Sequence, residues 1–172
     1  MLLETLEPSR LNHFWVGDIT YVPLCGGRFC YLATLMDRYS RRIVGWHLEM
    51  VMTKQLVFPT LREAIRERQP STPLIHHTNR GRRDASLRYL SSLRRADIRQ
   101  SMTRADNGYD NAFMESCFGT LKTELELVEY ANGSEAAREL AAYIRYYNAE
   151  RRHSALGYVS PAEFERHLAV PK

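Results

Sequence analysis

The sequence predicts an α/β fold, a five-stranded mixed sheet flanked by helices, and three observations lead to it. Apolar runs of strand length alternate with segments whose apolar residues recur at helical spacing. The first two strand runs are apolar on both faces, as expected of strands covered by helices on each side. The 172 residues, of which 44% are hydrophobic and 26% charged, suit one globular domain with a sizeable core.

Three strand-like runs stand near the start of the chain. Residues 1–13 show no clear period, so we expect an N-terminal arm or linker remnant there, followed by a single core over residues 14–168. Turn residues at 24–28 and 38–42 separate the expected strands. These strands are Phe14 to Val22, Phe29 to Met36 and Ile43 to Leu48.

A helix should follow, capped by Thr53 and running to about Arg68. Pro59 lies inside this pattern and should kink the helix or delay its start. A short apolar strand is expected at residues 73–75. The remaining expected elements are a helix capped by Ser86, a strand from Ile98 to Met102, a helix from Asn111 to Leu125, and a last helix from Ser134 to about Glu150.

The composition indicates in which cellular compartment the chain is expected. No segment reaches the length of uncharged apolar sequence that spans a bilayer, and no secretory signal is visible at the N-terminus. Cys25, Cys30 and Cys117 are odd in number and form no CxxC pair, which favours free thiols in a reducing, cytoplasmic setting.

The basic residues point to a phosphate-rich partner. The net charge is +4, and 21 of the 24 basic residues are arginines, whose forked guanidinium suits phosphate oxygens. Residues 74–104 hold eight Arg against two Asp, whereas residues 105–140 hold eight acids against two basic residues. A solvated, salt-bridged surface is the alternative for any single arginine. For the block beside Asn79 as a whole we favour a phosphate-facing surface.

Three polar residues stand at informative places. Asp18 lies inside the first buried strand, Asn79 follows the short apolar strand, and Glu115 lies in the helical pattern opened by Asp110 and Asn111. Residues 80–114 separate Asn79 from Glu115, a spacing of 35.

With its flanking motifs, this spacing resembles the DDE transposases and retroviral-type integrases, in particular the insertion-sequence transposases of bacteria. The resemblance extends from about Trp15 to Phe164 and implies the RNase H-like fold. Four segments in the family's order carry it: residues 15–21, residues 37–46, residues 109–116 with 121–124, and a C-terminal box within residues 147–164.

The resemblance implies a catalytic trio at Asp18, Asn79 and Glu115. Two Mg²⁺ or Mn²⁺ ions would be held there, with Asp18 bridging both ions and Glu115 holding one. Lys122 would contact DNA phosphate. The family has Asp where this chain has Asn79, which keeps one carbonyl oxygen but loses the charge, so metal binding should be weaker. The arginines expected to bind DNA beside the trio are Arg80, Arg82, Arg83 and Arg104.

The segment after Asn79 also departs from the family pattern. Arg82, Arg83 and Asp84 stand where a small or polar residue, Gln and Tyr usually follow. Asp84 is a conceivable substitute ligand, although capping of the next helix explains it better. The DNA-binding helices that such transposases carry upstream are not in these residues. We therefore expect recognition of transposon ends to come from another chain or to be lost.

The leading hypothesis is therefore a DNA transposition and integration core, impaired by Asn79. The alternative is a non-catalytic relic that binds DNA or self-associates, or that takes an intact transposase as its partner. A purely hydrolytic RNase H-like nuclease is a third class, and the C-terminal box argues against it.

Overall fold

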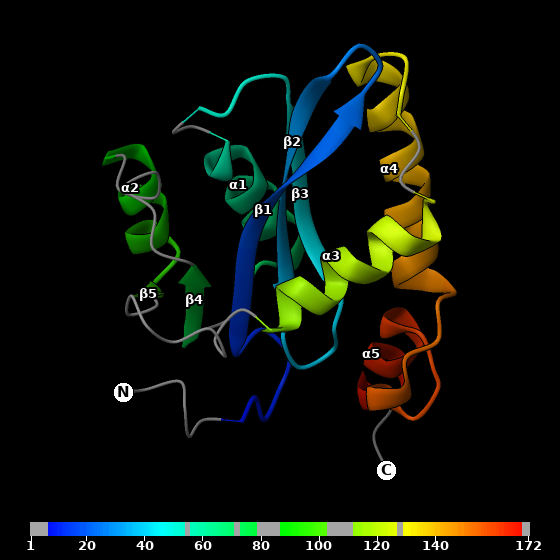
Figure 1. Cartoon of the computed structure of the whole chain (residues 1–172). Coiled ribbons are helices and arrows are strands. Elements are labelled where there is room, and N and C mark those ends of the chain that lie inside the picture. The colour runs from blue at the N-terminus through cyan, green and yellow to red at the C-terminus, as the bar shows by residue number, and fades with distance from the viewer. Residues whose placement is uncertain are drawn as a thin grey trace.

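A five-stranded mixed sheet forms the centre of the computed structural model, which describes residues 7–53, 56–70, 73–78, 87–102, 112–126 and 129–169 (Figure 1). The strand order is β3-β2-β1-β4-β5. β1 and β2 pair antiparallel, as do β2 and β3, whereas β4 is parallel to β1 and β5. The strands are β1 (Phe14–Leu24), β2 (Arg28–Asp37), β3 (Ile43–Glu49), β4 (Leu74–Thr78) and β5 (Ile98–Met102). This arrangement confirms the predicted fold class.

Helices cover both faces of the sheet. The helices are α1 (Val57–Arg68), α2 (Leu87–Arg95), α3 (Ala112–Glu124), α4 (Gly133–Ala149) and α5 (Pro161–Ala169). One core cluster joins α1 and α2 to the sheet through Trp15, Leu35 and Leu61. The other joins α3 and α4 to the opposite face through Val16, Met114 and Leu140. None of the described helices is long and apolar enough to cross a membrane.

Strand β1 occupies the middle of the sheet but is paired unequally along its two edges. Its whole length is hydrogen-bonded to β2, from Trp15 opposite Asp37 to Leu24 opposite Arg28. On the other edge, β4 pairs with β1 only from Phe14 to Gly17. Among the described residues, that edge is next paired at Leu24, which bridges to Tyr130. In the part of the chain that the structure describes, no strand pairs with this edge of β1 from Asp18 to Val22.

The first helix begins later than expected. It starts at Val57, with Leu56 at the N-cap and no side-chain cap, so the cap assigned to Thr53 was wrong. Pro59 occupies the first turn, where its missing N–H removes no helical hydrogen bond, and the predicted delay of the start is confirmed. The last predicted helix begins at Gly133, one residue before the expected Ser134, and its N-cap Asn132 accepts a hydrogen bond from the Glu135 backbone N–H (2.9 Å).

One strand also differs from expectation. Strand β4 continues through His76, His77 and Thr78, all three buried, instead of ending at Ile75. In α2 the buried side chains are Tyr89 and Leu93, whereas Leu87 is 86% exposed. Tyr89 is buried because its hydroxyl meets the ring of buried His76 (2.5 Å).

The C-terminal helix α5 was not predicted, although its start signal is in the sequence. Ser160 precedes Pro161, and Glu163 follows three residues after the serine, which is a capping-box pattern with proline at the first helical position. The Ser160 hydroxyl accepts a hydrogen bond from the Glu163 backbone N–H (3.2 Å). The box was interpreted only as a family motif, and its helical meaning was missed.

Candidate active site

Asp18 lies on the sheet face that α3 and α4 cover. Side chains alternate along β1, and Val16 and Val22, which share its parity, belong to the core cluster with α3 and α4. Asp18 pairs across the strands with Thr34, whose buried hydroxyl oxygen has no hydrogen-bond partner. The side chain of Asp18 is half-buried. The carboxylate of Asp18 and the hydroxyl of Thr34 are therefore neighbours on this face of the sheet.

Glu115 is exposed on α3 and lies beside the helix's apolar stripe. Met114, Cys117, Phe118 and Leu121 are buried and form this stripe. Ala112, Glu115 and Gly119 are exposed and Lys122 is half-buried, and all four lie on the flank that the helical period assigns to them.

Contact with β1 fixes the direction of that flank. The Lys122 ammonium lies 4.5 Å from the centre of the Tyr21 ring, in the second half of β1. Glu115 precedes Lys122 by seven residues, which is close to two turns and about 10 Å along the same flank. In Figure 1, the first turn of α3 lies beside the first part of β1, and the helix runs from there across the sheet toward α4. Glu115 thus shares the flank of α3 whose Lys122 contacts β1.

The third member of the trio, Asn79, lies outside the described residues, as do Arg80, Arg82, Arg83 and Arg104. The last described residue before it, Thr78, pairs with Gly17, the neighbour of Asp18. The chain therefore leaves β4 level with the residue that precedes Asp18.

Among the described residues, no group of three or more His, Cys, Asp or Glu side chains is arranged to hold a metal ion. Two of the three expected ligand positions, Asp18 and Glu115, are in the described part of the chain, and the third is an amide. The arginines of α2 and β5 present an exposed basic surface. Its exposed members in the described ranges are Arg88, Arg94, Arg95 and Arg99.

A buried charge network holds α5 against the sheet, and sequence reasoning missed it. Glu165 accepts two hydrogen bonds from the Arg68 guanidinium (2.8 and 2.9 Å), one from Arg42 (2.8 Å) and one from the Ser40 hydroxyl (2.7 Å). Asp37, fully buried, lies 3.7 Å from Arg68. The network connects α5, α1 and the β2–β3 turn.

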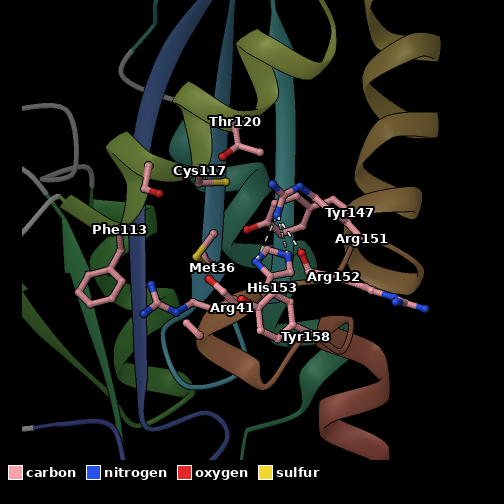
Figure 2. Close-up of a pocket in the computed structure, with 13 residues that line it drawn as sticks. Met36, Arg41, Phe113, Cys117, Thr120, Tyr147, Arg151, Arg152, His153 and Tyr158 are labelled. Atoms are coloured by element: carbon pink, nitrogen blue, oxygen red, sulfur yellow. Dashed lines mark hydrogen bonds between the residues drawn. The ribbon is translucent and has the colours of Figure 1, made fainter.

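A second feature that sequence reasoning missed is a cavity of about 460 Å³ on the other flank of α3 (Figure 2). Phe113 and Cys117 of α3 line it together with Arg41 of the β2–β3 turn and with Arg151 and His153, which follow α4. These residues are far apart in the sequence, so no local pattern could reveal the cavity.

Burial and neighbouring charges shift the pKa values of His153, Cys117 and Arg41, which line this cavity. Burial, with the nearby Arg151 and Arg41 guanidinium groups, lowers the pKa of His153 to about 4, so the ring is neutral at pH 7. Burial raises the pKa of the Cys117 thiol to about 11, so it is protonated. Burial also lowers the pKa of Arg41 from its usual value, and the neighbouring Arg38 adds to this effect.

Comparison with known proteins identifies the fold and the family. An integrase core domain model matches residues 8–107, and a second integrase core domain model matches residues 96–161. The transposase of insertion sequence element IS904 from Lactococcus lactis is 42% identical over 169 residues, which are 97% of this chain and 66% of that protein. The transposase InsF of insertion sequence IS3A from Escherichia coli is 39% identical over 96% of this chain and 58% of its own length. The chain thus spans about three fifths of the length of such relatives.

Solved structures agree at the level of the fold. The HTLV-2 integrase catalytic core domain in complex with magnesium superposes with a TM-score of 0.68 at 17% identity, over 90% of this chain and 96% of that one. A simian T-cell lymphotropic virus intasome chain gives a TM-score of 0.71 at 17% identity, over 94% of this chain and 56% of that chain. These cores share the RNase H-like fold. The chain therefore belongs to the integrase core domain family and is a core of the kind found in DDE transposases and retroviral integrases.

Proposed function

We propose that this chain is the catalytic core of a DNA transposition enzyme, with Asp18, Asn79 and Glu115 at its active site, and that Asn79 impairs it. The observation that carries the proposal is the placement of two carboxylates. Asp18 faces the layer that contains α3, and the α3 flank bearing Glu115 faces β1. The chain leaves β4 beside Gly17, one residue before Asn79.

The chemistry of these three side chains suits a divalent metal ion. Two carboxylates and one amide carbonyl are hard oxygen donors, the kind that Mg²⁺ and Mn²⁺ prefer. The unsatisfied Thr34 hydroxyl beside Asp18 adds an oxygen to the same place. Bound ions would supply charge neutralisation and activation of the attacking oxygen in phosphoryl transfer.

The side chains of the protein have separate tasks in this proposal. Asp18 and Glu115 supply the negative charge that attracts cations. Lys122, on the flank of Glu115, reaches a DNA phosphate after leaving the Tyr21 ring. Asn79 supplies an oxygen without charge, so the site offers two negative charges where the family pattern offers three. Metal affinity falls because charge-assisted contacts are the stronger ones.

The alternative is a non-catalytic relic that binds DNA or self-associates. The exposed arginines of α2 and β5 support DNA binding without requiring any metal. Metal binding separates the two proposals, since a relic has no need of two ions.

The test is Asn79→Asp, measured by calorimetry with Mg²⁺ and Mn²⁺ and by nicking of a supercoiled plasmid. Loss of an outer contact to a metal ligand commonly costs about 10- to 100-fold in affinity, so restoring a ligand charge should tighten binding at least about tenfold. The chain as it stands should show negligible metal-dependent nicking.

Asn79→Asp combined with Glu115→Gln is the matched control, since it has the same net charge as the original chain. The tighter binding should disappear in this double variant. Equal metal binding by the original chain and Asn79→Asp would contradict the carboxylate argument and favour the relic.

A further inference from the structure

The cavity on the far flank of α3 is positively charged and has no acid of its own. Its lining includes three arginines and one histidine and no Asp or Glu. Arg151 is neutralised, because its Nε donates a hydrogen bond to Glu124 (2.8 Å). Within the described ranges, no carboxylate lies within salt-bridge distance of Arg41. Arg41 therefore has no direct ion pair among the described residues, and the Glu7 carboxylate acts on it only from beyond salt-bridge distance.

The surroundings of Arg41 make that charge costly. Its guanidinium carbon lies 4.1 Å from the centre of the Phe113 ring, and that of Arg38 lies 4.4 Å from the same centre. Arg38 pairs only distantly with the exposed Glu7 (3.9 Å), and its buried Nε has no hydrogen-bond partner. The Arg38 and Arg41 guanidinium groups repel each other because both lie over the Phe113 ring. An anion bound between them and the cavity would offset this repulsion.

The backbone at two lining positions is strained. Arg41 has φ 61° and Tyr158 has φ 63°, a region that favours glycine. Asp37 fixes the first turn by accepting hydrogen bonds from the Tyr39 and Ser40 backbone N–H groups (2.8 and 3.4 Å). The second loop is closed by a hydrogen bond from the Tyr158 N–H to the His153 carbonyl (2.9 Å).

The strain at Tyr158 serves no packing purpose. Its side chain is 71% exposed, and in Figure 2 the ring lies next to His153 at the cavity. A glycine there would remove both the backbone strain and an exposed aromatic surface. An exposed aromatic ring together with a guanidinium that has no direct ion pair is the combination on which proteins hold unpaired nucleotides, by stacking the base and pairing the phosphate.

We propose that this cavity binds one unpaired nucleotide of the DNA substrate, with its phosphate on Arg41 and its base against Tyr158. The volume of about 460 Å³ is within the roughly 300–1,000 Å³ typical of small-ligand pockets. The hydroxyls of Ser116, Thr120 and Ser154 line the same space and can accept or donate hydrogen bonds to the sugar or base. This inference rests on the proposed function, because it takes DNA as the substrate.

The position of the cavity on α3 limits which nucleotide can enter it. Phe113, Ser116 and Thr120 face the cavity, whereas Glu115 and Lys122 lie on the opposite flank of the same helix. The two flanks are separated by about one helix diameter, roughly 10 Å. A single strand that leaves the Glu115 side can cross that distance within a few nucleotides, so the unpaired nucleotide belongs to the DNA end being processed.

The experiment measures binding of fluorescent duplexes to the full chain by anisotropy, at one fixed salt concentration. Three probes share one duplex sequence: a blunt end, a three-nucleotide 5′ overhang and a three-nucleotide 3′ overhang. One overhang should bind roughly tenfold more tightly than the blunt end, in line with stacking of one base. The ring resonances of His153 should shift on adding that overhang and not on adding inorganic phosphate at the same concentration.

The decisive variants are Tyr158→Gly and Arg41→Gly. Both relieve a strained φ, so both chains should unfold at or near the original temperature, and a loss of binding cannot then be ascribed to misfolding. Each should abolish the overhang preference and leave blunt-end affinity within about twofold. Gln69→Gly is the matched control, because Gln69 also has a positive φ (38°) but caps α1 away from the cavity. Tyr158→Phe should keep the preference.

An equal fall in affinity for all three probes would overturn the proposal, as would an overhang preference that survives both glycine variants. The outcome is independent of metal binding, since the anisotropy is measured without divalent cations. Failure of Asn79→Asp to bind metal would contradict the proposed catalytic function and leave the overhang result standing. No binding of any duplex would instead contradict DNA as the substrate.

Discussion

At the residue scale, two buried acids, Asp37 and Glu165, have pKa values that are shifted in opposite directions. Burial raises the pKa of Asp37 above its usual value, despite backbone hydrogen bonds from Asn12 and Tyr39. Burial also acts against the charge of Glu165, but hydrogen bonds from Arg68 and Ser40 outweigh it and hold its pKa below the usual value. The two acids share Arg68, and the one with the better hydrogen bonds keeps the charge more firmly.

His76 is a buried histidine of β4, and its protonation makes the free energy of unfolding depend on pH. It is fully buried, its Nε2 meets the Tyr89 hydroxyl, and burial lowers its pKa to about 4. The unfolded chain takes up this proton near pH 6.5 and the native chain only near pH 4. Between these values the unfolded state binds more protons, so the free energy of unfolding falls as the pH falls.

We therefore predict that His76 contributes roughly 3 kcal/mol to the loss of stability between pH 7 and pH 4, since a tenfold difference in proton affinity corresponds to about 1.36 kcal/mol. His76→Gln, which can still hydrogen-bond Tyr89, should show a correspondingly flatter dependence in urea unfolding. His167→Gln is the control, because the His167 side chain is 65% exposed. Identical pH profiles for the original chain and His76→Gln would refute the prediction.

At the scale of the element, α5 is attached chiefly through polar contacts. Glu165 is its buried charged side chain, and it binds residues of α1 and of the β2–β3 turn. The helix has only nine residues, too short to be stable alone. Asn148 of α4 holds the neighbouring edge, since its side-chain amide both accepts from and donates to the backbone of Ile43 (2.9 Å each).

Glu165→Gln should destabilise the chain by about 3 kcal/mol, because it leaves the largely buried Arg68 without its main counter-charge. Urea unfolding measures this loss, and limited proteolysis should cut residues 151–169 earlier in the variant. Glu163→Gln, on the same helix but with a side chain 44% exposed, should stay within about 0.5 kcal/mol of the original. Similar stability of the two variants would show that the network does not hold α5.

At the scale of the whole molecule, basic and acidic residues gather in different segments of the chain. The exposed arginines of α2 and β5 lie on the side of the sheet where β5, the neighbour of β4, is the edge strand. The acids of residues 105–140 lie in the segment that includes α3 and the start of α4. A basic region of this kind favours binding to DNA phosphates, with little preference for the base sequence.

We predict that the chain binds duplex DNA with log K falling against log salt at a slope near −3.6, if about four phosphates are neutralised. Replacing Arg94 and Arg95 together by Gln should reduce the slope by roughly 1.8 for two lost contacts. Arg166→Gln, an exposed arginine on α5, should leave the slope unchanged. Affinity that does not vary from low to moderate salt would show that these arginines have other roles.

The sequence by itself determined the sheet, the apolar stripe of α3 and the family. These follow from signals that are local in the chain: a period of two in strands, a period near 3.6 in helices, and fixed spacing between motif residues. Asp18 interrupts the apolar pattern of its strand, whereas Glu115 was assigned from the family motif and its spacing, and the roles of both residues stay predictions. The helix α5 could also have been found, from the capping box at Ser160 and Glu163.

Only the tertiary structure decided how α5 is held and where the charged cavity lies. Ser40 and Glu165 are 125 residues apart, and Arg68 and Glu165 are 97 apart. A contact between such distant residues depends on how the layers pack, and it leaves no periodic trace in the chain. The same holds for Arg41 and Tyr158, whose strained backbones and shared cavity exist only because the β2–β3 turn and the segment after α4 meet beside α3.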